Sequence, residues 1–269
     1  MPSNGEIGQV KNLSFSFEIG RVLGKLVKAY GFNVNFAPVL DVNSNPNNPV
    51  IGNRSFGSEP NIVAELGIQT MKGLEAEKII PTIKHFPGHG DTESDSHLEL
   101  PTVNKTLEEL EYLELVPFKR AIEAGADMVM VAHLLLPHLD AENPSSLSEK
   151  MIAGLLCNQL GFDGVVITDD LTMKAITNHY GIGQAALLSV KAGSDIVMVA
   201  HNYDDLVEVF STLKQAVLHG EISEARINES VERILKLKEK YEVTDTIVEN
   251  VDINALNNEI EDVLKKYMK

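Results

Sequence analysis

Residues 79–97 read IIPTIKHFPGHGDTESDSH, and this stretch decides the prediction of the fold. Its first part, Ile79 to Ile83, is a short apolar run of the kind found in buried strands. Its second part is a polar loop with glycines, histidines and acids in close succession. A strand that ends in a Gly-rich polar loop is where α/β folds carry their chemistry, because the sheet fixes the loop and the loop supplies the groups. The sequence therefore predicts a functional loop directly after a strand.

The chain around this stretch alternates apolar strands with amphipathic helices. We expect strands at residues 34–40, 79–83, 128–132, 165–168 and 196–199, with helices between them and further helices at 203–218 and 223–241. The strands are mostly continuous apolar runs, a pattern typical of a parallel sheet covered by helices. A capping-box pattern from Thr106 to Glu109 predicts one helix start, and Pro117 predicts another. The sequence thus predicts an α/β fold built from five strand–helix units.

Polar residues follow the last apolar residue of four of these strands, namely Asp41, His85, His133 and Asp169. In a parallel barrel the carboxyl ends of the strands share one face, on which catalytic groups gather. We therefore expect these four side chains to lie on one active-site face.

Composition narrows the class of protein. The 269 residues carry a formal net charge of −16, which disfavours a nucleic-acid groove or an anionic membrane surface as partner. Cys157 is the only cysteine, so no internal disulfide can form. No apolar run approaches the roughly 20 residues needed to span a bilayer. The first residues lack the pattern of a signal peptide, so we expect a cytoplasmic location for the chain as written, or a secreted or cell-wall location if a preceding extension exists.

The histidines and acids of the loop also allow a metal-site interpretation. Their spacing fits no standard zinc pattern, and Gly88 and Gly90 are more typical of a mobile loop than of a fixed cage. We expect no metal and no cofactor, and we interpret His89 and Asp91 as structural. Asp169 taken alone is more typical of a helix N-cap after its strand, and with the surrounding segment considered Asp170 is the better candidate for that cap.

Three segments together resemble glycoside hydrolase family 3, in its β-N-acetylhexosaminidase branch. They are KHFPGHG followed by DSH at residues 84–97, NFAPVLD at 35–41 and GFDGVVITD at 161–169. The resemblance extends from about residue 14 to about residue 240. It implies a TIM-type (β/α) barrel and the removal of terminal β-N-acetylglucosamine from peptidoglycan fragments, with carbohydrate as the partner.

The resemblance also implies roles for individual residues. Asp169 corresponds to the nucleophile of a retaining double displacement, His97 to the acid/base and Asp95 to its dyad partner. Arg54, Lys84 and His85 correspond to ligands of sugar hydroxyls. We expect Asp41 to orient Arg54 or Lys84 by charge pairing, and His133 to line the pocket or to fill the mouth of the barrel.

The five predicted strands match strands four to eight of the family barrel. We therefore expect residues 1–241 to form a barrel domain that lacks its N-terminal part, followed by a polar helical tail at 242–269. A sheet that does not close exposes its edges, so a homo-oligomer that completes the open barrel is a possible partner. Two alternatives stay open: an inactive or partner-dependent fragment, and a β-glucosidase or xylosidase of the same family.

Overall fold

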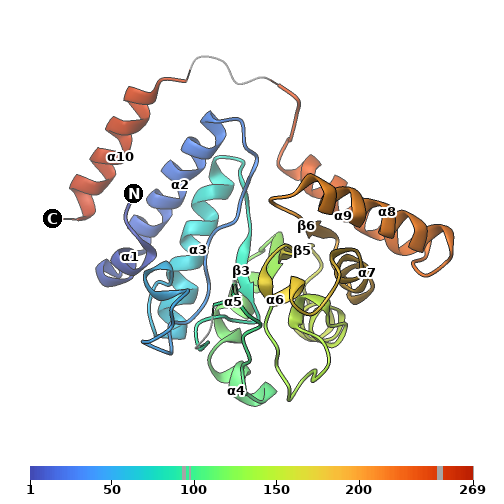
Figure 1. Cartoon of the computed structure of the whole chain (residues 1–269). Coiled ribbons are helices and arrows are strands. Elements are labelled where there is room, and N and C mark those ends of the chain that lie inside the picture. Colours follow the sequence, from blue (N-terminus) through green and yellow to red (C-terminus); the bar gives the residue numbers. More distant parts are fainter. Residues whose placement is uncertain (93–94, 97, 247–250, 269) are drawn as a thin grey trace.

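The computed structural model describes residues 1–92, 95–96, 98–246 and 251–268 of the chain. Its centre is a row of parallel strands in the order of the sequence (Figure 1). Strand β1 (Val34–Asn35) pairs with β2 (Ile80–Pro81). A four-stranded sheet then has the order β3-β4-β5-β6, formed by Ile83–Phe86, Met128–Val131, Val165–Asp170 and Ile196–Met198. A parallel bridge from Val39 to Lys84 continues the pairing of the first strand region alongside β3.

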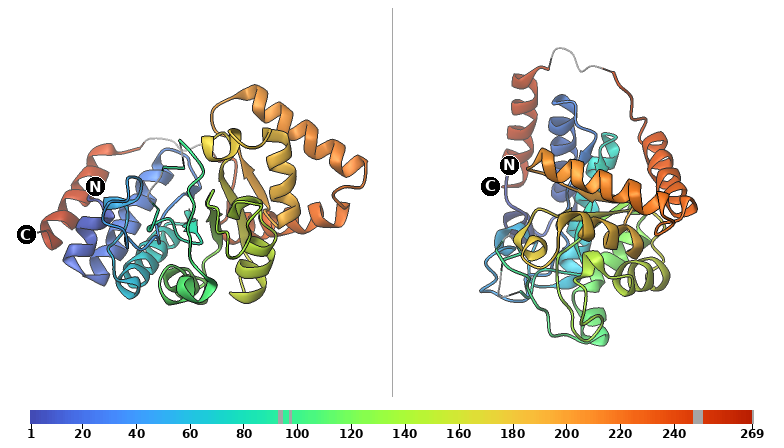
Figure 2. Two further views of the ribbon diagram at one scale, coloured as in Figure 1. Left: turned by 60° about the horizontal axis from the view of Figure 1, so that its bottom comes forward. Right: turned by 45° about the vertical axis from the view of Figure 1, so that its right-hand side comes forward.

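Helices connect and cover these strands. The α-helices are α1 (Asn4–Val10), α2 (Leu13–Ala29), α3 (Pro60–Ala76), α4 (Leu107–Tyr112), α5 (Leu115–Glu123), α6 (Lys174–Thr177), α7 (Ile182–Ala192), α8 (Tyr203–Leu218), α9 (Glu224–Lys240) and α10 (Ile253–Tyr267). Two short 3₁₀ helices are η1 (Gly52–Arg54) and η2 (Ser145–Leu147), and η3 (Lys150–Gln159) is a π-helix. Figure 2 shows α2 and α3 on one side of the strands and α7 and α8 on the other.

Side chains alternate between the two faces of the strands, and each face packs into a separate apolar core. Val129 and Val166 point outward and pack with Phe118 of α5. Their neighbours Met130 and Ile167 point to the opposite face and pack with α9 residues such as Leu237. Successive side chains of a strand face opposite sides, so Asp169 shares the face of Ile167, two residues earlier. Burying a side chain such as Phe118 contributes about 2–3 kcal/mol, so the core around Phe118 helps to hold β4 and β5 in place.

The last helix packs back onto the second. The rings of Phe15 and Tyr267 stack with centroids 5.1 Å apart, and Glu259 of α10 binds Lys25 at 2.7 Å. Figure 1 shows α10 beside α2, at the opposite side of the molecule from α9. The predicted polar tail therefore contains a helix with one apolar side, which adds to the core around α2.

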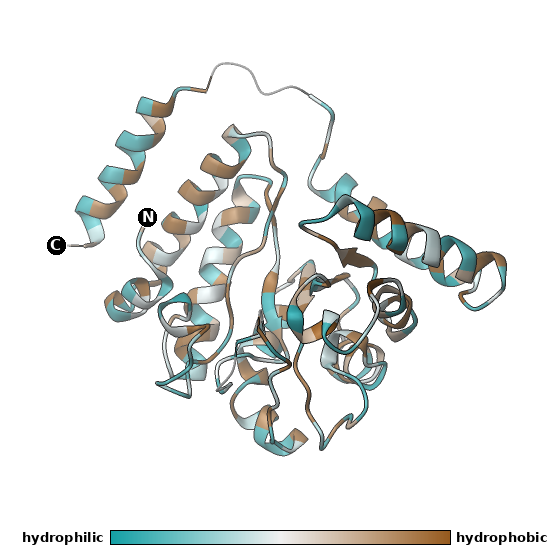
Figure 3. Cartoon of the chain, in the orientation of Figure 1, coloured by the Kyte–Doolittle hydropathy of each residue, from teal (hydrophilic) through white to brown (hydrophobic). Residues whose placement is uncertain are grey.

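The predicted fold class is confirmed: the chain is α/β, with five parallel strand regions of the TIM-barrel type. The described strands form no closed barrel, because β1 and β6 are the two ends of the row. Strand β6, brown in Figure 3, is only half-buried. Beside it, α8 exposes Tyr203, Leu206, Val207 and Phe210 at helical spacing.

Several predicted boundaries differ from the structure. The strand expected at 34–40 pairs regularly only at Val34–Asn35 and again at the Val39 bridge, because Pro38 has no N–H to donate. His85 and Asp169 lie inside β3 and β5, not after them. Helix α5 begins at Leu115, two residues before Pro117. Within the described part of the chain, no helix combines the length and apolar character that a membrane crossing requires.

Candidate active site

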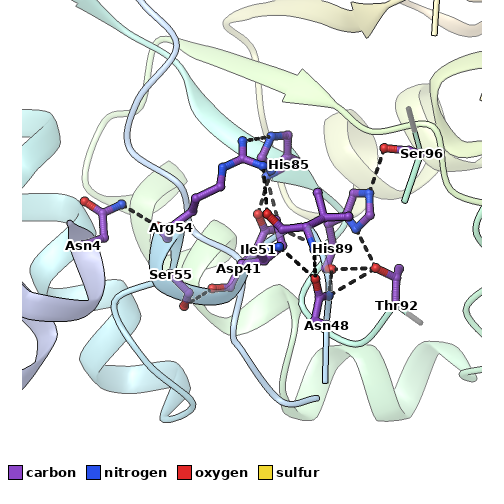
Figure 4. A network of polar contacts seen from close by, with 11 residues as sticks. Asn4, Asp41, Asn48, Ile51, Arg54, Ser55, His85, His89, Thr92 and Ser96 are labelled. Carbon is purple, nitrogen blue, oxygen red and sulfur yellow. Dashed lines mark hydrogen bonds and ion pairs between the residues drawn. The ribbon is translucent and has the colours of Figure 1, made fainter. Parts of the chain in front are cut away.

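Asp41 is the centre of the polar network at the carboxyl ends of the strands (Figure 4). Its buried carboxylate accepts hydrogen bonds from the His85 ring Nδ1 at 2.7 Å, from the His85 main-chain N–H at 3.2 Å and from the His89 main-chain N–H at 2.7 Å. Burial alone would raise the pKa of Asp41, but the contacts with His85 and His89 outweigh it and lower the pKa below its ordinary value. Asp41 therefore stays ionised and fixes both histidines.

His85 links this carboxylate to Arg54. Because a carboxylate only accepts, His85 Nδ1 carries a proton, and Nε2 faces Arg54 Nη2 at 3.3 Å. The hydrogen bonds of the Asp41 carboxylate go to the two histidines, and Arg54 joins the network through His85. Toward Lys84 the carboxylate acts by its charge, so the expected pairing with Lys84 is electrostatic. Asn4 of α1 donates to the Arg54 carbonyl at 2.6 Å and anchors the η1 turn from the other side.

Asp169 lies at the end of β5 with a largely buried carboxylate. Burial would raise its pKa, but His85 and His133, the Asp170 N–H at 2.9 Å and Lys84 together lower the pKa below its ordinary value. The expected grouping of Asp41, His85, His133 and Asp169 on one face is thereby supported, because their side chains interact electrostatically or through hydrogen bonds. An ionised, largely buried carboxylate of this kind is suited to nucleophilic attack.

Lys84 interacts by charge with Asp41 and with Asp169, the two acids of the site. Burial lowers the pKa of its ammonium, the neighbouring Arg54 lowers it further, and Asp169 and Asp41 oppose the shift. Lys84 and Arg54 also line a cavity of about 540 Å³, together with Phe36, Val39 and residues 49–53. Such a volume lies in the range of small-molecule sites, and donors on its wall suit clustered hydroxyl oxygens.

His133 is fully buried and fixes the backbone beyond Asp169. Its Nε2 lies 3.0 Å from the Asp170 carbonyl and therefore donates, since a carbonyl only accepts. Its Nδ1 lies 2.6 Å from the Ser146 hydroxyl. Of the two roles left open for His133, the structure favours filling and bracing the strand ends.

Asp170 does not cap a helix, which corrects our expectation. The N-cap of α6 is Met173, three residues later. The Asp170 carboxylate instead accepts from the N–H and hydroxyl of Thr172, at 3.0 and 2.6 Å, and from the Ala200 N–H at 3.2 Å. It therefore ties the end of β5 to the segment after β6.

The loop that follows β3 holds the other predicted residues. His97 lies outside the described residues, so its position relative to Asp169 stays a prediction. Asp95 is described, and its carbonyl accepts from the N–H groups of Leu98 and Glu99 at 2.9 and 3.0 Å. At the base of the loop, Lys105 binds Asp91 at 2.8 Å and also Glu114, which supports a structural role for Asp91.

Sequence reasoning missed several residues that shape the site. Asn48 donates to the His89 carbonyl at 2.8 Å, and Ser55 donates to the Asp41 carbonyl at 2.6 Å. Both residues lie in loops, and each bonds a residue more than ten positions away in the sequence, so no local sequence pattern marks them. Among the residues that the structure describes, no group of three His, Cys, Asp or Glu side chains is arranged to hold a metal.

The fold and site agree with the comparisons to known proteins. The model of the glycosyl hydrolase family 3 N-terminal domain matches residues 1–237, so the chain belongs to glycosyl hydrolase family 3. This confirms the family predicted from the loop and strand segments.

Individual relatives show which members of the family the chain resembles. The chain is 35% identical to β-hexosaminidase A of Pseudoalteromonas piscicida over 89% of its own length, and 44% identical to a β-hexosaminidase of Neisseria meningitidis serogroup C over 71%. A solved family 3 β-N-acetylglucosaminidase of Paenibacillus sp. matches 98% of the chain with a TM-score of 0.91 and 41% identity. The chain spans 42% and 52% of the two relatives, and 52% of the solved chain.

Proposed function

We propose that this chain carries the active site of a retaining β-N-acetylhexosaminidase that removes terminal β-N-acetylglucosamine from peptidoglycan fragments or related glycosides. The observation that carries the proposal is the ionised, largely buried carboxylate of Asp169 beside Lys84, His85 and His133. Membership of family 3 and similarity to proteins named β-hexosaminidase support the substrate class.

In the proposed reaction Asp169 attacks the anomeric carbon and displaces the leaving oxygen, forming a covalent glycosyl-enzyme. His97 gives a proton to the leaving oxygen and later takes one from the attacking water, with Asp95 as its partner. An imidazole can carry out both proton transfers because its unperturbed pKa lies near neutrality. Arg54, Lys84 and His85 hold the sugar hydroxyls, and Asp41 keeps His85 oriented for that contact.

Three aryl glycosides test the proposal: the N-acetyl-β-glucosaminide, the β-glucoside and the β-xyloside. We expect turnover of the first and much slower turnover of the other two. Proton NMR of early product should show the β-anomer, as retention requires. Folded protein that turns over none of them between pH 5 and 8 rejects the proposal, and a preference for the glucoside or xyloside selects the alternative within the family. Release of N-acetylglucosamine from purified muropeptides tests the natural substrate.

His97→Ala tests the acid role. Aryl substrates with good leaving groups need little protonation, so their hydrolysis should survive better than that of natural glycosides. Equal losses on both kinds of substrate count against the role.

A partner-dependent fragment is the second candidate, favoured by the end strands β1 and β6 and by the exposed apolar side of α8. In this candidate another polypeptide, such as a second copy of the chain, covers this region. Light scattering after size exclusion tests it, with Phe210→Ser as the variant. A wild-type monomer with sharp thermal unfolding contradicts this candidate, and a dimer that the variant dissociates supports it.

A further inference from the structure

His89 connects the carboxylate of Asp41 to the segment that contains Asp95. His89 as a whole is 2% exposed, and its ring has Nδ1 2.8 Å from the Thr92 hydroxyl and Nε2 3.1 Å from the Ser96 hydroxyl. Its main-chain N–H donates to Asp41 at 2.7 Å. Figure 4 shows the ring between Thr92 and Ser96. Both ring nitrogens are thus engaged by hydroxyl groups of the loop.

Ser96 continues this connection to the strand that carries Asp169. Its side chain meets His89, and its carbonyl accepts from the Ala175 N–H of α6 at 3.2 Å. Helix α6 follows directly after β5, whose end contains Asp169. Ser96 is itself 2% exposed, so these bonds are shielded from water. A hydrogen-bonded path therefore runs from Asp41 through His89 and Ser96 to Ala175.

This path crosses between segments that are distant in the sequence. Asp41 follows the first strand region, His89 and Ser96 belong to the loop after β3, and Ala175 follows β5. Asp95 is the neighbour of Ser96 in the chain, so the position of Ser96 sets where the Asp95 backbone stands relative to β5.

We infer that His89 is a positioning residue that fixes the Asp95–Ser96 segment relative to Asp169. The inference rests on the proposed function, in which Asp95 partners the acid/base. His89 does not touch substrate in this scheme, because both ring nitrogens are already bonded within the loop. An imidazole suits this role because two nitrogens on opposite sides of a rigid ring can bond two hydroxyl groups at once.

The first experiment measures leaving-group dependence. His89→Gln and Ser96→Ala are compared with wild type on a dinitrophenyl N-acetyl-β-glucosaminide and on a glycoside with an alkyl leaving group. A misplaced proton donor slows only the substrate that needs protonation. We expect kcat/KM to fall about 10–100-fold for the alkyl glycoside and less than about 3-fold for the dinitrophenyl glycoside. The double variant should be no worse than His89→Gln alone, because both changes break one path.

Matched controls are His219→Gln in the turn after α8 and Ser211→Ala on the exposed side of α8, which should behave as wild type. Equal losses on the two substrates, or additive losses in the double variant, overturn the inference.

The second experiment does not need activity. Hydrogen exchange of the same variants should show faster exchange at the Ala175 amide and at residues 95–96, with β4 and α5 unchanged. If the wild type hydrolyses no substrate, the proposed function fails, and exchange still decides the positioning role. Unchanged protection at Ala175 in both variants overturns it. Ser96→Ala removes one hydroxyl group and serves if His89→Gln does not fold.

Discussion

The carboxylate of Asp41 holds the ring of His85 at 2.7 Å across 44 residues of sequence, and this pair is buried. The same carboxylate binds the main chain of His89, so one acid organises both ends of the KHFPGH segment. A buried carboxylate with three hydrogen bonds cannot be replaced without leaving donors unpaired.

Asp41→Asn should therefore destabilise the fold. The amide keeps the volume of the side chain but removes the charge and turns a donor toward one of the bound N–H groups. We expect a loss of about 3 kcal/mol in the free energy of unfolding, measured by urea denaturation at pH 7. Asp163→Asn, at an exposed position before β5, serves as the control and should stay within about 0.5 kcal/mol of wild type. A variant of Asp41 as stable as this control contradicts the central role of the carboxylate.

Asp169→Ala tests the proposed nucleophile. Because Asp169 forms the glycosyl bond in the proposed mechanism, we expect kcat on the aryl N-acetyl-β-glucosaminide to fall by about 10⁴-fold or more. The variant should unfold as cooperatively as wild type, since β5 is held by the packing of Val166 and Ile167. Activity within tenfold of wild type would remove Asp169 from the mechanism.

Local features of the fold could be predicted from the sequence, whereas contacts between distant segments could not. The capping box at Thr106 and the bounds of α8 are confirmed, because turn and helix signals lie within a few residues. The position of His133 just after β4 follows from the apolar run before it, whereas Asp169, expected after its strand, lies in the last two residues of β5. The partners of Asp41 depend on how two loops meet, and the packing of α10 on α2 joins residues more than 200 positions apart. No periodicity in a single sequence encodes such pairings.

Glu75 gives a prediction for pH dependence. It lies in the last turn of α3, where burial and the neighbouring carboxylate of Asp127 raise the pKa of Glu75 to about 7. The unfolded chain ionises this group near 4.3, so the folded state binds more protons between these values. Stability from Glu75 is therefore fully present below about pH 4.3 and is lost as pH rises through 7.

Glu75→Gln removes this titration. Relative to wild type, we expect an equal free energy of unfolding at about pH 4, below the unfolded pKa, and a gain of about 1 kcal/mol at about pH 8, reduced by solvent screening at this partly exposed site. Urea denaturation at the two pH values measures the difference. Glu239→Gln on the exposed side of α9 is the control and should show no such pH-dependent gain. A gain that is the same at both pH values would place the effect elsewhere than in ionisation.

The substitution Gly90→Ala tests whether the loop after β3 must lie close to the segment that follows the first strand region. A Cβ atom at this position would overlap the carbonyl oxygen of Val42, which belongs to the backbone and cannot move aside cheaply. The overlap would push the loop away from the segment after Asp41 and strain the hydrogen bond from the Asn45 N–H to the Gly90 carbonyl, 3.3 Å long. We expect Gly90→Ala to cost about 2 kcal/mol or more.

Gly154→Ala is the matched control, because a Cβ there meets only the Glu149 carbonyl at 3.7 Å, an ordinary contact. Thermal unfolding of the two variants separates steric overlap from the general effect of adding a methyl group. Since Asp41 holds His89, one residue before Gly90, the displaced loop should also lose aryl-glycoside activity in Gly90→Ala and keep it in Gly154→Ala. Wild-type stability and activity in Gly90→Ala would mean that the loop does not need its contact with Val42 to place His89.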